Sequence, residues 1–183
     1  MAMPIETERL LLRDFVEADW RALHEYGSNP EVVRYLPWGP NTEEDSRDFI
    51  RRSIEIQNES PRRRFEIGIV LKEEDRLIGG CGIRENNPTL REGNLGYVLN
   101  RDYWGRGIAT EAARALVRFG FETLELHRIF ATCYPENKAS ERVLQKCGMS
   151  LEGRLRENLL MRGEWRDSLL YAILDHEWSD CTC

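Results

Sequence analysis

Cysteine is scarce in this sequence, and its pattern excludes two kinds of site. The five cysteines are odd in number and form no Cys-x-x-Cys pair, so they predict neither a disulfide framework nor a zinc site. We expect small buried apolar residues and a reactive C-terminal tail from Cys81, Cys133, Cys147, Cys181 and Cys183. No metal is expected to bind.

Long apolar runs are also missing. No apolar stretch approaches the roughly 18 residues of a membrane-spanning helix, and the N-terminus lacks the basic and then apolar pattern of a signal peptide. We therefore expect a cytoplasmic location and no membrane partner. Internal repeats, low-complexity segments and linkers are absent too, and 183 residues fit a single domain spanning 1–183.

Positive charge is in the minority. The sequence carries 26 Lys and Arg against 32 Asp and Glu, a net charge of −6 at pH 7. This balance argues against nucleic acid as the direct partner, because phosphate backbones require clustered cations. It is compatible with a cationic or amine substrate. The run Arg62-Arg63-Arg64 is the exception, and we expect a solvated loop before a strand there, in preference to a phosphate contact.

The hydrophobic periodicity predicts both strands and helices. The expected strands cover residues 8–15, 65–71, 77–83, 94–99, 127–134, 151–155 and 168–174. The expected helices cover residues 16–26, 29–36 and 43–57, with two more that begin at Ile108 and Lys138. Charged side chains on the helix from Ile108 are expected to form a solvated stripe: Glu111, Arg114, Arg118 and Glu122. Strands followed by a strand–helix–strand–helix–strand order indicate a mixed sheet with helices on both faces.

The most informative stretch begins just before the helix at Ile108. Gly105 and Gly107 flank Arg106, and glycine lets a backbone approach a ligand closely. The first turn of a helix leaves N–H groups without partners, and the helix dipole favours negative charge there. Arg106 adds a cation and Thr110 a hydroxyl donor, so the stretch predicts a pyrophosphate site. It is neither a P-loop nor a dinucleotide fingerprint, whose third glycine it lacks.

The neighbouring segments make a family resemblance specific. In chain order they are Gly96-Tyr97-Val98-Leu99, Tyr103-Trp104-Gly105-Arg106-Gly107-Ile108-Ala109-Thr110-Glu111-Ala112, Asn137-x-x-Ser140 and Cys147-Gly148-Met149. This order resembles the GNAT superfamily of acyl-CoA N-acyltransferases, and more closely its RimJ/RimL-like branch, which acetylates ribosomal-protein N-termini. The superfamily's phosphate loop is Gln/Arg-x-x-Gly-x-Gly/Ala. Gly107 and Ala109 match its last two fixed positions, whereas Trp104 replaces the first, as in that branch.

The resemblance implies an α/β (α+β) fold with a mixed, mostly antiparallel sheet, helices on both faces and a splayed central pair of parallel strands. It also implies acetyl-CoA as co-substrate, with the pantetheine arm between those strands. Gly96 sits where a bulge could open them, although it could also simply relieve crowding. The implied CoA-binding residues are Tyr97, Val98, Leu99, Trp104, Gly105, Arg106, Gly107, Ile108, Ala109, Thr110, Asn137 and Ser140.

Amide formation from a thioester needs a neutral amine, a polarised carbonyl and a proton for the departing thiolate. The backbone N–H of Val98 or Leu99 is the expected polariser. Ser140 is the candidate proton donor, because the serine of Asn-x-x-Ser lies near the CoA sulfur in the resembling branch. The tyrosine that more often serves in the superfamily is replaced here by Leu144. Asn137 is expected both to cap a helix and to touch the pantetheine.

The general base is the least defined of these roles. Many relatives carry a glutamate on the strand before the phosphate loop, where this chain has Asn94. Glu85 and Glu92 lie near the same cleft edge by sequence, and Glu85 is our candidate.

Three functions are compatible with these residues. The leading hypothesis is an acetyl-CoA-dependent N-acetyltransferase that acts on a protein or peptide α-amine. The acceptor could instead be a small-molecule amine, such as a polyamine, an amino acid or a drug. A CoA-binding module without turnover is the third, since both the glutamate and the tyrosine are missing. Trp38 is expected to line the acceptor groove, and a homodimer is possible.

Overall fold

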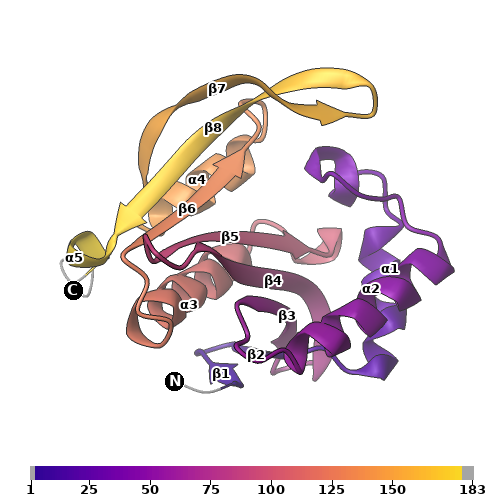
Figure 1. Ribbon diagram of the computed structural model, residues 1–183. Coiled ribbons are helices and arrows are strands. Elements are labelled where there is room, and N and C mark those ends of the chain that lie inside the picture. Colours follow the sequence, from indigo (N-terminus) through magenta and orange to yellow (C-terminus); the bar gives the residue numbers. More distant parts are fainter. Residues whose placement is uncertain (1–2, 179–183) are drawn as a thin grey trace.

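The computed structural model describes residues 3–178, which form one eight-stranded mixed sheet with helices on both faces (Figure 1). The strands lie in the order β1-β2-β3-β4-β5-β6-β8-β7, and every neighbouring pair is antiparallel except β5 and β6. This confirms the predicted fold class. The strands are β1 (Ile5–Glu6), β2 (Leu10–Asp14), β3 (Arg64–Leu71), β4 (Arg76–Asn87), β5 (Glu92–Leu99), β6 (Arg128–Cys133), β7 (Ser150–Met161) and β8 (Glu164–Leu174).

Helices α3 and α4 pack on one face of the sheet over the larger core cluster, whereas α1 and α2 cover part of the opposite face with a second cluster. The α-helices are α1 (Trp20–Gly27), α2 (Glu43–Gln57), α3 (Ile108–Glu122), α4 (Lys138–Lys146) and α5 (Asp175–Trp178). Short 3-10 turns are η1 (Glu17–Asp19), η2 (Val32–Tyr35) and η3 (Arg101–Tyr103). Residues 29–36 were expected to be a helix, and only the tighter turn η2 forms there.

Strand alternation assigns side chains to the two faces. Phe65 and Ile83 belong to the larger cluster under α3, and the Phe65 ring meets Phe119 of α3 edge-on at 5.1 Å. Val70 and Leu77 belong to the cluster under α1 and α2. Residues that alternate with Phe65 and Ile83 therefore project from the face opposite α3.

The predicted helix starts are confirmed at two caps. The Thr42 hydroxyl accepts a hydrogen bond from the Asp45 N–H at 3.1 Å, and the Asp45 carboxylate accepts one from the Thr42 N–H, which completes a capping box for α2. At α4, the Asn137 side chain accepts from the Ser140 N–H at 3.1 Å. Each cap pairs an N–H that the helix itself leaves unpaired.

The parallel pairing of β5 and β6 is short. It runs only from Glu92 opposite Arg128 to Asn94 opposite Phe130, and from Leu95 onward the two strands have no ladder between them. The suggested bulge at Gly96 is wrong, because β5 pairs with β4 in regular register through Gly96, and the irregularity lies between Glu85 and Asn87. The strands therefore separate because their parallel ladder stops, while β5 stays paired to β4.

The C-terminal hairpin is longer than the sequence pattern indicated. Strands were expected over residues 151–155 and 168–174, yet β7 and β8 continue to a turn at Arg162 and Gly163 and form a long curved hairpin at the end of the sheet (Figure 1). Leu160 and Trp165, on the added length, are both 61% exposed. A strand exposed to this degree shows little in-out alternation in its sequence, which explains why its length was underestimated.

Cys81, Cys133 and Cys147 are free and buried, as expected, whereas Cys181 and Cys183 lie outside the described residues. Burial raises the pKa of the Cys133 thiol to about 11 and that of the Cys147 thiol to about 12, so both stay protonated near neutral pH. None of the helices within residues 3–178 is long and apolar enough to cross a membrane.

Candidate active site

The loop before α3 has a backbone conformation that only glycine adopts readily. Gly105 and Gly107 have φ of +75° and +77°, in the left-handed region that favours glycine. Gly107 is the N-cap of α3, so no cap side chain covers the N–H groups of the first turn. A Cβ built at Gly105 would meet nothing within 4 Å, which leaves its surface open. These N–H groups and the helix dipole together fit a pyrophosphate.

Trp104 and Tyr103 connect this loop to the rest of the site. The Trp104 indole N–H donates to the Leu99 carbonyl at 2.9 Å, which joins the loop to the end of β5. The Arg106 guanidinium lies 5.2 Å from the centre of the Tyr103 ring. The loop thus starts where β5 ends, five residues after the parallel pairing with β6 stops at Asn94.

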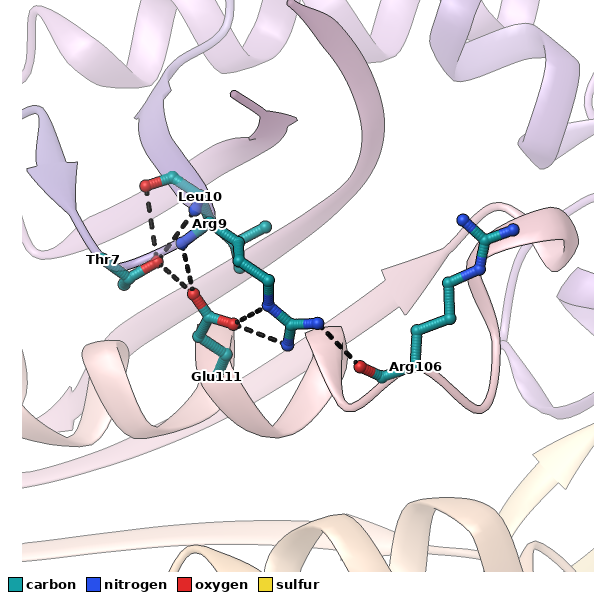
Figure 2. Close-up of polar contacts among 5 residues, drawn as sticks. All are labelled: Thr7, Arg9, Leu10, Arg106 and Glu111. Carbon is teal, nitrogen blue, oxygen red and sulfur yellow. Dashed lines mark hydrogen bonds and ion pairs between the residues drawn. The ribbon is translucent and has the colours of Figure 1, made fainter. Parts of the chain in front are cut away.

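A contact from the connection between β1 and β2 holds the other side of the loop (Figure 2). The Glu111 carboxylate, in the first turn of α3, accepts from the Thr7 hydroxyl at 2.6 Å, the Arg9 N–H at 2.9 Å and the Arg9 Nε at 2.7 Å. Arg9 Nη1 in turn donates to the Arg106 carbonyl at 2.9 Å. Glu111 was expected on a solvated stripe, and this is wrong: only 18% of its side chain is exposed.

The ionisation of Glu111 depends on this contact. Burial is the largest single influence and opposes ionisation, but the hydrogen bonds from Thr7 and Arg9 together outweigh it and lower the pKa of Glu111. A lowered pKa stabilises the fold above the pKa of the unfolded carboxyl, and that contribution is lost as pH falls through the folded value. The contact between Arg9 and Glu111 is therefore fully formed at neutral pH.

Replacing Arg9 with glutamine should weaken acetyl-CoA binding by roughly 3- to 10-fold, because the Arg106 carbonyl loses a charged donor and the loop is less well held. Calorimetry on the folded variant measures the effect. Arg51→Gln is the control, since Arg51 pairs with Asp48 on the surface of α2. Glu111→Gln should give a similar loss, and the double variant little more than either single one. If the losses in affinity of the two single variants add up in the double variant, Arg9 and Glu111 do not act through one shared contact.

Tyr97 and Ser140 meet across the gap between β5 and α4. The Tyr97 phenol donates to the Ser140 carbonyl at 3.1 Å, and its oxygen lies 2.9 Å from Ser140 Oγ. Burial raises the pKa of the phenol and is only partly offset by the Ser140 hydrogen bond, so Tyr97 keeps its proton. The sequence indicated Ser140 and the backbone of Tyr97, but not that the Tyr97 side chain binds Ser140.

On the face of the sheet opposite α3, side chains also connect the C-terminal hairpin and the end of β6 to an N-terminal segment. In the hairpin turn, Arg162 Nη2 donates to the carbonyls of Val33 and Gly39, each at 3.3 Å. The rings of Tyr35 and Tyr134 lie 5.7 Å apart, and join the same N-terminal segment to the residue after β6. Figure 1 shows the hairpin reaching across to this segment. Residues far apart in sequence therefore enclose one end of this face.

Glu85 and Glu92, the candidate general bases, lie apart from Ser140 and the end of β5. Glu85 pairs with Gly93 across β4 and β5, and its carboxylate is 3.7 Å from Arg63 Nε. It is five positions along β4 from Gly80, the partner of Val98, on the order of 16 Å at the rise of a strand. Glu92 accepts from Arg128 at 2.7 Å. The structure does not bring either glutamate beside Ser140.

The sequence pattern also missed an acidic residue on the face opposite α3. Glu66 of β3 alternates with Phe65 and lies across from Gly82 of β4. Alternation along residues 64–71 was its only sequence signal, since Phe65 and Ile67 had to be buried. Within residues 3–178, no group of three or more His, Cys, Asp or Glu side chains is arranged to hold a metal ion.

Comparison with known proteins identifies the family. Residues 9–150 match the family model described as an acetyltransferase (GNAT) domain. The chain belongs to the GNAT acetyltransferase family. It is 39% identical to the uncharacterized N-acetyltransferase YnaD of Bacillus subtilis over 97% of this chain and 100% of that one. A GNAT-family acetyltransferase from Bacillus anthracis superposes with a TM-score of 0.85 at 38% identity, covering 95% of this chain and 99% of that one.

Two relatives whose names state the acceptor differ in the acceptor that they acetylate. The chain is 28% identical to the [ribosomal protein uS5]-alanine N-acetyltransferase of Escherichia coli, over 96% of this chain and 92% of that one. It is 27% identical to the spermidine N(1)-acetyltransferase of the same organism, over 91% and 87%. The family is thus an N-acetyltransferase family, and this GNAT chain is similar both to a protein-acetylating and to a polyamine-acetylating member.

Proposed function

We propose that this GNAT protein transfers the acetyl group of acetyl-CoA to the N-terminal α-amine of a protein or peptide, by direct attack in a ternary complex. The observation that carries the proposal is the glycine-capped start of α3 beyond the end of β5, after a stretch of β5 that is not paired to β6, with the Tyr97–Ser140 pair in the gap. The first turn of α3 suits the pyrophosphate, and the unpaired edge of β5 suits the pantetheine amides. Together they fit the co-substrate.

Each group then has a role in the transfer. The loop from Trp104 to Thr110 binds the pyrophosphate through its N–H groups. The Asn100 N–H donates to the Ile78 carbonyl of β4, so by strand alternation the N–H of Val98, opposite Gly80, also faces β4 and is not the polariser. Backbone groups of Tyr97 and Leu99 face the gap and pair with the pantetheine, and the N–H of Leu99 polarises the thioester carbonyl as negative charge develops on its oxygen. Ser140 gives its proton to the departing thiolate and is reprotonated by the proton that the amine nitrogen loses as the amide forms, while Tyr97 and the Asn137 cap hold the serine in place.

We expect an α-amine to be a better acceptor than a lysine side chain. An α-amino group has a pKa of roughly 7.7–8.0, against ~10.4 for lysine, so making lysine neutral costs ~3.5 kcal/mol more. A glutamate base could supply that difference, but the β5 position where relatives carry one holds Asn94. Peptides with free N-termini should therefore be acetylated faster than the same peptides blocked at the N-terminus and carrying a lysine.

Thiol release from acetyl-CoA, measured with both peptides, tests this expectation. Mass spectrometry of the product locates the acetyl group and controls for hydrolysis. Robust lysine acetylation with idle N-termini would contradict both the acceptor assignment and the interpretation of Asn94. A panel that includes spermidine and single amino acids tests the small-molecule alternative. Acetyl-CoA binding without thiol release on any amine would leave only a CoA-binding module.

A further inference from the structure

On the face of the sheet opposite α3, two glycines lie beside the carboxylate of Glu66, so almost no side chains cover the backbone there. Glu66 of β3, Gly82 of β4 and Gly96 of β5 are in register across three strands. A Cβ built on Gly82 would lie 3.2 Å from Glu66 Oε2, whereas one built on Gly96 would meet nothing within 4 Å. Gly96 is exposed and follows Asn94, the last residue paired to β6. We call Glu66, Gly82 and Gly96 the acceptor floor.

A row of cations borders this floor two residues further along the strands. Arg64 of β3 lies directly opposite Arg84 of β4, and Arg84 opposite Asn94 of β5. Arg64 Nε is 2.7 Å from Glu66 Oε1, so one of the two guanidinium groups is already matched by the carboxylate. Both arginines are exposed. Like charges directly opposite one another on adjacent strands are unfavourable, and an anion bound between them would relieve the repulsion.

The neighbouring cations do not share this arrangement. Arg62 is bound to Asp14 at 2.6 Å and stacks over Phe65 at 4.4 Å, and Arg63 lies against Glu85. The run expected to be a solvated loop thus divides: Arg62 and Arg63 precede β3, whereas Arg64 is its first residue. Of these three arginines, only Arg64 belongs to β3, the strand that carries Glu66 of the acceptor floor.

We propose that the acceptor floor binds an α-amine that carries a carboxylate close by, with the amine at the Glu66 carboxylate and the carboxylate at Arg84, since Arg64 is already matched by Glu66. This inference rests on the proposed acetyl transfer and narrows its substrate class. Two residues of strand separate the floor from the cation row, a span of ~7 Å. An extended peptide covers a similar span in two residues, so an acidic side chain at the second position fits. A polyamine would place a second ammonium group beside Arg64 and Arg84, and these arginines would repel it.

The test compares three peptides that differ only at the second residue, which is Asp, Ala or Lys. In the wild-type protein, kcat/KM should fall from Asp to Ala to Lys, with at least about tenfold between the extremes, because juxtaposed like charges oppose binding. Arg84→Glu should reverse the order, and Arg84→Gln should abolish the preference. Arg51→Glu, which makes the same change in net charge on the surface of α2, should keep it. Free aspartate in the same assay distinguishes an amino acid from a peptide as the source of the carboxylate.

Equal kcat/KM for the Asp and Lys peptides, or spermidine as the best acceptor, would overturn the proposal. So would an Arg84→Glu variant with wild-type preference. If no amine releases thiol, the proposed function fails, but calorimetric titration of the Asp and Lys peptides in the presence of CoA still decides the inference. Tighter binding of the Asp peptide, lost in Arg84→Gln, supports the assignment. Equal binding or absent binding rejects it.

Discussion

Replacing Ser140 with alanine should lower kcat for acetyl transfer by about 10²–10⁴-fold, the usual contribution of a general acid, while acetyl-CoA affinity changes little. A proton donor acts mainly in the transition state, so its loss appears in kcat more than in binding. The fold should survive, because the cap of α4 uses the backbone N–H of Ser140, which alanine retains. Tyr97→Phe should give a smaller loss, since it removes only the group that orients the serine.

Steady-state kinetics and calorimetry on the same variants make the comparison. Ser53→Ala is the matched control, because Ser53 also lies on a helix and its buried hydroxyl donates to the Phe49 carbonyl at 2.9 Å, away from the gap. If Ser140→Ala keeps kcat within about threefold, the barrier has changed by less than ~1 kcal/mol. Ser140 would then be only a packing and capping residue.

Replacing Gly107 with valine should weaken acetyl-CoA binding by at least about tenfold, or ~1.4 kcal/mol, in a protein that still folds. Valine would place a branched side chain at the N-cap of α3, next to the N–H groups that the pyrophosphate approaches. Its Cβ would lie 3.6 Å from Arg9 Nη2, so the fold itself has room for it. The loss should therefore come from blocked approach of the ligand.

Backbone strain needs its own control, because a left-handed residue other than glycine costs roughly 1–2 kcal/mol. Gly163 in the hairpin turn has φ of +82° and nothing within 4 Å of an added Cβ. Gly163→Val thus carries the same strain away from α3, and its acetyl-CoA affinity should stay at the wild-type value. Unchanged affinity in a folded Gly107→Val protein would refute the placement of the pyrophosphate.

The glycine loop before α3 could be predicted from the sequence because its conformation is local. Gly105 and Gly107 need only their own backbone conformation, and α3 begins at the next residue with an apolar stripe of period 3.6. The caps at Thr42 and Asn137 were predictable for the same reason, since a cap joins residues three positions apart. The hairpin β7–β8 was only half predicted, because exposed strands carry a weak pattern.

The sequence by itself determined the order of elements, the mixed sheet, the glycine loop before α3 and the family. Only the tertiary structure decided which side chains meet. Arg9 and Glu111 are 102 positions apart, and Tyr97 and Ser140 are 43 apart. Glu66 is aligned with Gly82 and Gly96 by the register of three strands. Periodicity encodes which face a residue occupies but not which strand lies beside it, because that pairing depends on the packing of the whole sheet.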